Sequence, residues 1–187
     1  MNLGIVQKET PYGEKNSRKT IYYIEDNMFR FWYRYVFANR TLIETGAQQA
    51  VWAKRIEPDY NTYMGLIFEK VCTDYLCVKN ANGELPILFT SVGRWWGTNP
   101  VTHGQEEIDL VANDGKDYIF GECKWRNEKL DLSVLRKLKE KADIFCKNRS
   151  NTYYALFSKS GFTEAVINEA KSDRNIMLFD LNEIMNF

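Results

Sequence analysis

The sequence predicts an α/β fold in which helices cover the faces of a mixed sheet. Two observations lead to this prediction. From about residue 60 onward, helical and strand patterns alternate in the order helix, three strands, helix, strand, helix, strand. The composition, with 44% hydrophobic residues, 11 glycines and 4 prolines in 187 residues, is that of a globular chain. This order of elements is typical of a sheet with helices packed on it.

Length and composition also exclude several classes of protein. A chain of 187 residues fits one ordinary domain and a short extra piece, but not two full enzymatic domains. No window of about 18 residues is free of charge, and the N-terminus lacks the apolar stretch of a signal peptide, so we expect a cytoplasmic protein with no membrane partner. With one histidine and no CxxC pair, we expect reduced thiols and no zinc site. The cysteines are Cys72, Cys77, Cys123 and Cys146.

Residues 1–45 have the pattern of the end of a winged-helix region. Short strand patterns at 3–8 and 19–24 flank a polar loop and predict the hairpin of the wing. A helical pattern follows at 25–40, with Asp26 as its N-cap. A lone hairpin and helix cannot bury aromatic rings, so the rings pack either on the rest of the chain or on a missing partner. The apolar residues at helical spacing are Phe29, Trp32, Tyr33 and Val36.

Residues 46–187 form the second predicted domain, and its first half is delimited by turn signals. An apolar stripe at helical spacing predicts a helix over residues 61–79. Asn82 and Gly83 turn the chain, and the Asn-Asp-Gly-Lys run at 113–116 is typical of a tight hairpin. These signals separate three predicted strands, at residues 85–93, 106–112 and 117–124.

The second half of this domain alternates regularly. Leucines at helical spacing predict a helix over residues 132–147. An apolar run at 153–158 predicts a buried strand, and a helix at 163–172 leads to a last strand at 176–181.

The hairpin of the second and third strands carries charged residues inside an otherwise apolar sheet. A two-residue Asp114-Gly115 loop sets Asp109 opposite Phe120, and alternation then places Asp109, Glu122 and Lys124 on one face. The two carboxylates become diagonal neighbours, about 7–8 Å apart at the backbone. The opposite face receives Ile108, Leu110, Gly121 and Cys123.

Two carboxylates and a lysine in one place favour a metal site. Like charges at this separation repel, and a divalent cation would compensate them. Oxygen ligands are typical of Mg²⁺ or Mn²⁺, and Lys124 could orient or deprotonate an attacking water. The combination predicts metal-assisted phosphodiester hydrolysis. The alternative interpretation is an exposed hairpin with a Glu–Lys pair on a solvated face.

With Asp109 on one strand and Glu122-Cys123-Lys124 on the next, the chain resembles the PD-(D/E)XK nuclease superfamily over residues 60–180. The resemblance implies a restriction-endonuclease-like αβββαβ core, Mg²⁺ or Mn²⁺ as cofactor, DNA as substrate, and sites that often act as pairs in a homodimer. Ile108 stands where the motif nominally has proline. By position, Glu69 in LIFEKVCTDYL matches a further catalytic and metal-ligating glutamate, and the Cys123 carbonyl matches a further metal ligand.

A narrower resemblance covers nearly the whole chain. The stretches LGIVQKETP, YYIEDNMFRFWYRYV, FEKVC, GRWWG, EEIDLVA and FGECKW are similar to the C-terminal part of archaeal-type AAA ATPases that end in a domain of unknown function. In that family an ATPase module precedes a winged helix and this nuclease-like domain. The resemblance implies an AAA ATPase domain as partner, on a missing upstream segment or on a separate chain.

Candidate nucleic-acid contacts lie on both sides of the hairpin. Arg94, Trp95 and Trp96 could stack on bases and contact a phosphate, or the tryptophans could belong to the core. Residues 124–149 carry nine Lys and Arg against four acids, although the whole chain has a formal net charge of zero. These basic residues could follow a phosphate backbone, or they could form an ordinary solvated helix face. The candidates here are Arg126, Arg136, Lys137 and Lys139, and Lys141 lies with the last three away from the leucine stripe of the predicted helix.

Two functional hypotheses therefore stand. One is a metal-dependent DNA nuclease, in which His103 is either an ordinary loop residue or a water relay near the metal. The other is a non-catalytic DNA-binding or protein-docking module that serves an ATPase. The neutral net charge and the aromatic content of residues 22–37 favour docking.

Overall fold

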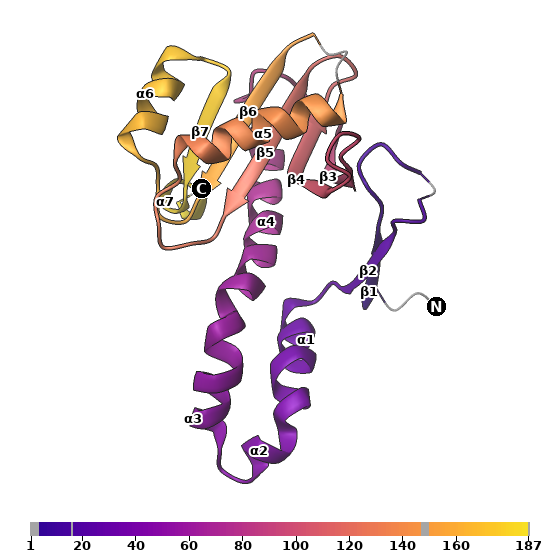
Figure 1. Cartoon of the computed structure of the whole chain (residues 1–187), viewed down its shortest axis with the longest axis vertical. Helices are drawn as coiled ribbons and strands as arrows, with labels where there is room; N and C mark the ends of the chain where they lie inside the picture. Colours follow the sequence, from indigo (N-terminus) through magenta and orange to yellow (C-terminus); the bar gives the residue numbers. More distant parts are fainter. Residues whose placement is uncertain (1–3, 16, 147–149, 187) are drawn as a thin grey trace. The chain divides into compact units, whose positions relative to one another are not determined.

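The structure is a computed structural model that describes residues 4–15, 17–146 and 150–186. Three residues used in the predictions lie outside the described residues. They are Leu3 of the first predicted strand, Lys147 of the predicted helix and the basic stretch, and Arg149 of the basic stretch. The chain divides into two compact units (Figure 1). Unit 1 comprises Met1–Thr10 and Glu14–Ile67, and unit 2 comprises Pro11–Gly13 and Phe68–Phe187.

Unit 1 consists of a hairpin and a series of short helices. In the hairpin, β1 (Val6–Glu9) pairs antiparallel with β2 (Ile21–Ile24). The Asp26 carboxylate accepts a hydrogen bond of 2.9 Å from the Phe29 N–H at the start of α1, which confirms the predicted cap. The helical elements in order are α1 (Asn27–Phe31), η1 (Trp32–Val36), η2 (Phe37–Asn39), α2 (Arg40–Glu44), α3 (Gln48–Val51), η3 (Trp52–Ile56) and the first turns of α4 (Glu57–Ala81).

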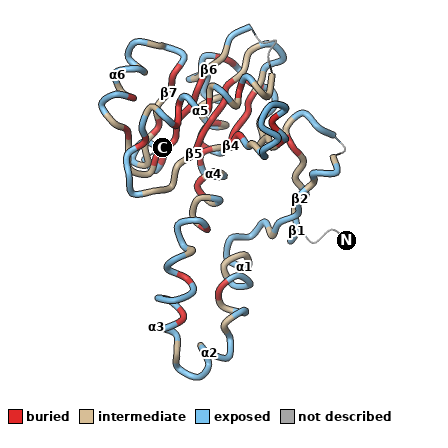
Figure 2. Tube along the Cα trace, viewed as in Figure 1, coloured by how far each residue is buried: buried red, intermediate tan, exposed pale blue. Residues whose placement is uncertain are grey.

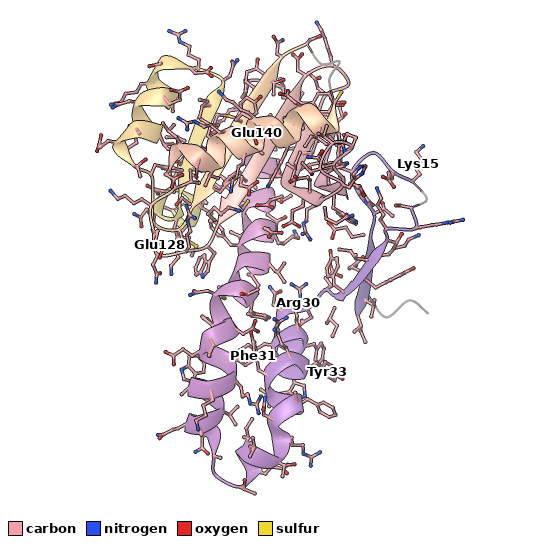
Figure 3. The ribbon with its side chains drawn as sticks, in the orientation of Figure 1. Lys15, Arg30, Phe31, Tyr33, Glu128 and Glu140 are labelled. Atoms are coloured by element: carbon pink, nitrogen blue, oxygen red, sulfur yellow. The ribbon has the colours of Figure 1, made fainter. Side chains whose placement is uncertain are left out.

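The apolar side chains that recur at helical spacing in residues 25–40 do not form the core of unit 1. Phe29, Trp32 and Tyr33 are exposed, whereas Tyr35 is buried and packs against Phe31, with ring centroids 5.1 Å apart. Phe31 and Tyr33 are labelled in Figure 3. Phe31 and Tyr35 are four residues apart and share one helical face, and this face packs into the core. The buried residues of this core are Tyr35, Val51, Ile56 and Tyr63.

The Asp59 carboxylate of α4 forms hydrogen bonds with two residues of η1 in unit 1. Arg34 donates to Asp59 through Nε at 2.7 Å and Nη2 at 2.9 Å, and the Tyr35 hydroxyl donates to Asp59 at 2.6 Å. These hydrogen bonds from Arg34 and Tyr35 lower the pKa of Asp59. Burial, followed by the bond to Asp59, raises the pKa of Tyr35 to about 12. The cluster lines a polar pocket of about 400 Å³, together with Ala38, Asn39 and Arg55.

We expect Asp59→Asn to destabilise the protein by about 1 kcal/mol at neutral pH, because charge-assisted hydrogen bonds are lost at a site with a side chain 35% exposed. A lowered folded-state pKa gives stability that is present above the ordinary carboxyl pKa and is lost as pH falls through the folded-state value. The difference from wild type should therefore shrink below about pH 4. Thermal unfolding followed by circular dichroism between acid and neutral pH measures both effects.

Asp74→Asn is the matched control, because Asp74 pairs with Lys70 one turn away on an exposed helix face. We expect that substitution to cost about 0.5 kcal/mol or less. Equal losses for Asp59→Asn and the control at neutral pH would contradict a stabilising role for the Asp59 cluster.

Unit 2 is built on a five-stranded mixed sheet, as the sequence predicts. Its strand order is β3-β4-β5-β6-β7, with antiparallel pairing up to β5 and parallel pairing from β5 onward. The helices follow in the predicted positions along the chain, and α7 is an additional short one (Figure 1). The bounds are β3 (Ser91–Thr98), β4 (Gln105–Asn113), β5 (Tyr118–Lys124), α5 (Leu132–Phe145), β6 (Thr152–Ser158), α6 (Glu164–Ser172), β7 (Ile176–Asp180) and α7 (Leu181–Met185).

Two apolar clusters hold the sheet between its helices. The first joins residues of α4, such as Cys72 and Leu76, to Leu110 and Cys123 of the sheet. The second joins residues of α5, such as Leu138, to Phe120 and other strand residues. Buried residues concentrate in the strands (Figure 2). In the part of the chain that the structure describes, no helix combines the length and apolar character needed to cross a bilayer.

The first strand of the sheet begins later than predicted. Residues 85–90 form no strand, because Asn80 at the end of α4 binds the Phe89 backbone through both its amide donor, at 3.0 Å, and its amide acceptor, at 2.9 Å. Ile87 and Phe89 are nevertheless buried, so the apolar run marks a packed loop. The strand instead continues through Trp95 and Trp96.

Candidate functional site

The charged hairpin has a four-residue loop, not the predicted two-residue loop. Asn113 lies opposite Tyr118, and Leu110 lies opposite Gly121. The Asp114 carboxylate accepts hydrogen bonds from the N–H groups of Lys116, at 2.9 Å, and Asp117, at 2.8 Å, which extends the turn. The register therefore differs from the predicted one by two residues.

Continuing this register by one pair sets Asp109 directly opposite Glu122, which is closer than the predicted diagonal arrangement.

A β-bulge fixes the position of Asp109. On β3 and β4, Gly93 lies opposite Val111 and Trp95 lies opposite Ile108, so Asp109 and Leu110 together face Arg94. Such a bulge redirects side chains and is common beside active sites. The prediction that Ile108 and Leu110 share one face of the sheet is therefore wrong. The bulge places them on opposite faces, where they join different apolar clusters.

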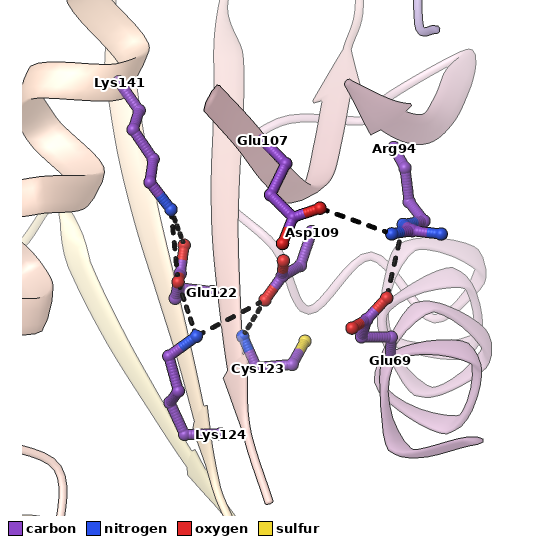
Figure 4. Close-up of polar contacts among 8 residues, drawn as sticks. All are labelled: Glu69, Arg94, Glu107, Asp109, Glu122, Cys123, Lys124 and Lys141. Carbon is purple, nitrogen blue, oxygen red and sulfur yellow. Dashed lines mark hydrogen bonds and ion pairs between the residues drawn. The ribbon is translucent and has the colours of Figure 1, made fainter. Parts of the chain in front are cut away.

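Asp109 and Glu122 are held in a network of charged contacts (Figure 4). Each of the two residues is only 5% exposed. Asp109 accepts a 2.8 Å hydrogen bond from the Cys123 N–H, and its Oδ2 lies 4.0 Å from the Lys124 Nζ. Lys124 donates to Glu122 Oε1 at 2.6 Å, and Lys141 of α5 donates to both Glu122 oxygens, at 3.0 and 3.3 Å.

Burial governs the electrostatics of this network. Burial and, next, the charge of Glu122 raise the pKa of Asp109 to about 6, against the opposing effect of Lys124. Burial by itself lowers the pKa of Lys124, but the carboxylates of Glu122 and Asp109 outweigh it, so that pKa is raised. The lysines thus supply the positive charge that the two carboxylates need.

A second group of charges adjoins the first. Arg94 Nε lies 3.2 Å from Glu69 Oε2, and Arg94 Nη2 lies 3.7 Å from Glu107 (Figure 4). Burial and the charge of Asp109 raise the pKa of Glu69 to about 8, against the opposing effect of Arg94.

The predicted residues are only partly gathered. The structure brings together Asp109, Glu122 and Lys124, while Glu69 is paired with Arg94. The Cys123 side chain is buried in the core, as predicted for a filler. Among the described residues, no group of three or more His, Cys, Asp or Glu side chains could by itself hold a metal ion. The two buried carboxylates, with water and phosphate as further ligands, fit the chemistry of Mg²⁺.

The predicted nucleic-acid contacts divide between packed and exposed positions. Trp95 packs on the α5 side of the sheet, with its ring centroid 5.6 Å from that of Phe145. Lys139 lies 3.6 Å from Asp173 and over the Tyr154 ring. Half-buried positions are held by Arg94, Trp96 and Arg126, and exposed positions by His103, Arg136 and Lys137.

Sequence reasoning missed Lys141 as a member of the site. Lys141 was grouped with the solvent-facing lysines of the basic helix, yet it follows the buried Leu138 by three positions and Val134 by seven. These spacings place it at the border of the helix face that packs on the sheet. That position was the available signal.

Comparisons with known proteins identify a family but no activity. Residues 32–143 match the family DUF234, described as archaeal and bacterial proteins of unknown function. An uncharacterized protein of Methanocaldococcus jannaschii, MJECL04, is 36% identical over 188 residues, covering 98% of this chain and 39% of the relative. The chain thus spans about two fifths of that relative. A crystal structure of a protein of unknown function, AF1548, is 15% identical, with a TM-score of 0.37 over 64% of this chain and 65% of that one.

Proposed function

Because this chain belongs to the DUF234 family, whose function is unknown, we propose a function from the chemistry of the site: a divalent-metal-dependent nuclease with a restriction-endonuclease-like, PD-(D/E)XK-type domain. One observation carries the proposal. Two buried carboxylates on adjacent strands, Asp109 and Glu122, are both within ion-pair distance of Lys124. DNA is the proposed substrate.

The energetics support a functional origin for this cluster. Asp109 and Glu122 are each only 5% exposed, and burying two like charges costs free energy. Replacing a buried ionic group by apolar residues is often neutral or stabilising, so stability alone does not explain this pair. A buried ionisable group with a perturbed pKa, such as Asp109, is more common at functional sites than in ordinary cores.

The roles of the residues follow from their positions. Asp109 and Glu122 would hold Mg²⁺ or Mn²⁺, and Glu69 would assist if it left Arg94. The metal would supply Lewis-acid activation of a phosphoryl oxygen and of a bound water. The Lys124 ammonium lies between the two carboxylates, where it would orient the attacking water and offset the negative charge that grows on the phosphate. The Cys123 N–H holds Asp109 in its orientation.

We further propose that the domain works with an AAA ATPase module, as in the family it resembles. The greater length of the M. jannaschii relative leaves room for such a module in that protein.

A non-catalytic docking module is the second candidate, and a specific observation favours it. The helical elements α1, η1 and η2 of unit 1 expose large apolar side chains, including Met28 at 76% exposure. Exposed apolar groups in such a number are typical of interaction surfaces. The others on these elements are Phe29, Trp32, Tyr33 and Phe37.

The decisive experiment measures Mn²⁺ binding by calorimetry and cleavage of supercoiled plasmid with Mg²⁺, Mn²⁺ or EDTA. We expect the wild-type chain to bind Mn²⁺ and to cut only with a metal present. Asp109→Asn should weaken Mn²⁺ binding at least about tenfold, because a carboxylate ligand is lost. Glu128→Gln, at an exposed acidic position, is the control and should match wild type (Figure 3). Absence of Mn²⁺ binding by wild type would leave the docking module as the function.

A further inference from the structure

We propose that Lys141 is an internal competitor of the divalent cation: it neutralises Glu122 in the metal-free protein and must leave that carboxylate for the cation to bind. The inference rests on the proposed function and concerns the regulation of the same site. It assigns a role to a residue outside the motif formed by Asp109, Glu122 and Lys124.

The contacts of Glu122 carry the argument. Its Oε1 accepts from Lys124 at 2.6 Å and lies 3.3 Å from the Lys141 Nζ, and its Oε2 accepts from Lys141 at 3.0 Å. Both oxygens therefore already face an ammonium group. Since the Glu122 side chain is only 7% exposed, a cation that binds these oxygens takes the place of a lysine.

The two lysines differ in their attachments. Lys124 sits two residues after Glu122 on the same strand, and its Nζ also lies 4.0 Å from Asp109. Lys141 reaches the site from α5, and among the described residues its hydrogen bonds go to Glu122. A long, flexible stem lets an ammonium move away without backbone change. Lys141 is therefore the lysine that yields.

A purely structural role for Lys141 predicts the opposite sign. If Lys141 only held Glu122 in place, its loss would leave the carboxylate misplaced and would weaken cation binding. If Lys141 competes with the cation, its loss removes an opposing charge and strengthens binding. The direction of the change in affinity therefore separates the two roles.

The test compares Mn²⁺ affinities of wild type, Lys141→Met and Lys137→Met by calorimetry without nucleic acid. We expect Lys141→Met to bind Mn²⁺ about tenfold more tightly, the size of effect that one close charge has on a carboxylate's affinity for a proton. Lys137→Met removes an exposed charge from the same helix and should change the affinity less than about twofold. Lys141→Gln, uncharged but still a donor, should tighten binding in the same direction and serves if the methionine variant does not fold.

Each outcome separates the proposals. Mn²⁺ binding by wild type with an unchanged or weaker affinity in both Lys141 variants overturns the competition and leaves the nuclease proposal standing. Equal tightening in Lys141→Met and Lys137→Met would reduce the effect to net charge and also overturn it. No Mn²⁺ binding by any of the proteins overturns both proposals.

Discussion

Replacing Lys124 with alanine is expected to lower metal-dependent DNA cleavage about 1,000-fold without weakening Mn²⁺ binding. The Lys124 ammonium lies 2.6 Å from Glu122 Oε1 and 4.0 Å from Asp109 Oδ2, beside the position where the reacting phosphate would be held. Positioned groups that orient a nucleophile or stabilise developing charge contribute on the order of 10²–10⁴ in rate. Both carboxylate ligands remain in this variant, so binding and catalysis should separate.

Single-turnover cleavage rates and Mn²⁺ calorimetry on the same samples check this expectation. Lys129→Ala is the matched control, since Lys129 is an exposed lysine five residues later in the chain. It should cleave within about twofold of wild type if exposed charge alone has little effect. Cleavage by Lys124→Ala at the wild-type rate would contradict the role given to Lys124, even if the metal dependence of the wild-type protein were established.

The order of elements in unit 2 was predictable because each element carries its own local signal. The helix of residues 132–147 and the strand of 153–158 correspond to α5 and β6 within a few residues. In α5 the leucines recur at helical spacing, with Leu135 and Leu138 buried, and Asp131 caps the first turn by accepting from the Ser133 N–H. Local pattern and final packing agree here, so the sequence alone leads to the right fold class.

The geometry of the carboxylate pair was less predictable because it depends on side chains at the turn and on a bulge. The Asn113 side chain accepts from the Gly115 N–H at 2.7 Å, and the Asp114 carboxylate holds two further N–H groups. These contacts convert an apparent two-residue loop into a four-residue one. The bulge at Asp109 and Leu110 arises from pairing with β3, which no local pattern encodes. The sequence therefore predicted that Asp109 and Glu122 are neighbours, but it did not predict the register that sets them directly opposite each other.

The ion pairs around the site were also beyond local patterns. Arg94 stays a predicted nucleic-acid contact, and the structure adds ion pairs with Glu69 of α4 and Glu107 of β4. Lys141 was predicted on a solvated face, but it donates to Glu122. Long charged side chains form ion pairs with residues of other helices and strands, so these contacts can be known only from the tertiary structure.

The largest expected change in stability comes from Gly121, the residue that precedes Glu122 in the central strand β5. A Cβ added at Gly121 would lie 3.0 Å from the Leu110 Cβ and 3.5 Å from Phe157 Cε2, and both neighbours are fully buried. Gly121 also lies between Leu110 on β4 and Ala155 on β6 in the register. The sheet therefore has little room for a branched side chain here.

Gly121→Val should destabilise the protein by about 3 kcal/mol, because overpacking a closely packed core forces neighbours to shift. For a chain of this length that corresponds to a fall in Tm of about 6–12 °C, measured by calorimetry or circular dichroism. Gly121→Ala should cost less, since its single added carbon meets one close contact and reduces the entropy of the unfolded chain.

Gly65→Ala on α4 is the control for the loss of a glycine, because an added Cβ there meets nothing within 4 Å. It should raise stability by about 0.5–1 kcal/mol, the difference in helix propensity between glycine and alanine. A Gly121→Val variant as stable as wild type would mean that β4 and β5 can separate at Leu110. Such freedom would also loosen the opposition of Asp109 and Glu122, one residue away on each strand, so the Gly121 variants test whether the strand packing that supports the carboxylate pair is rigid.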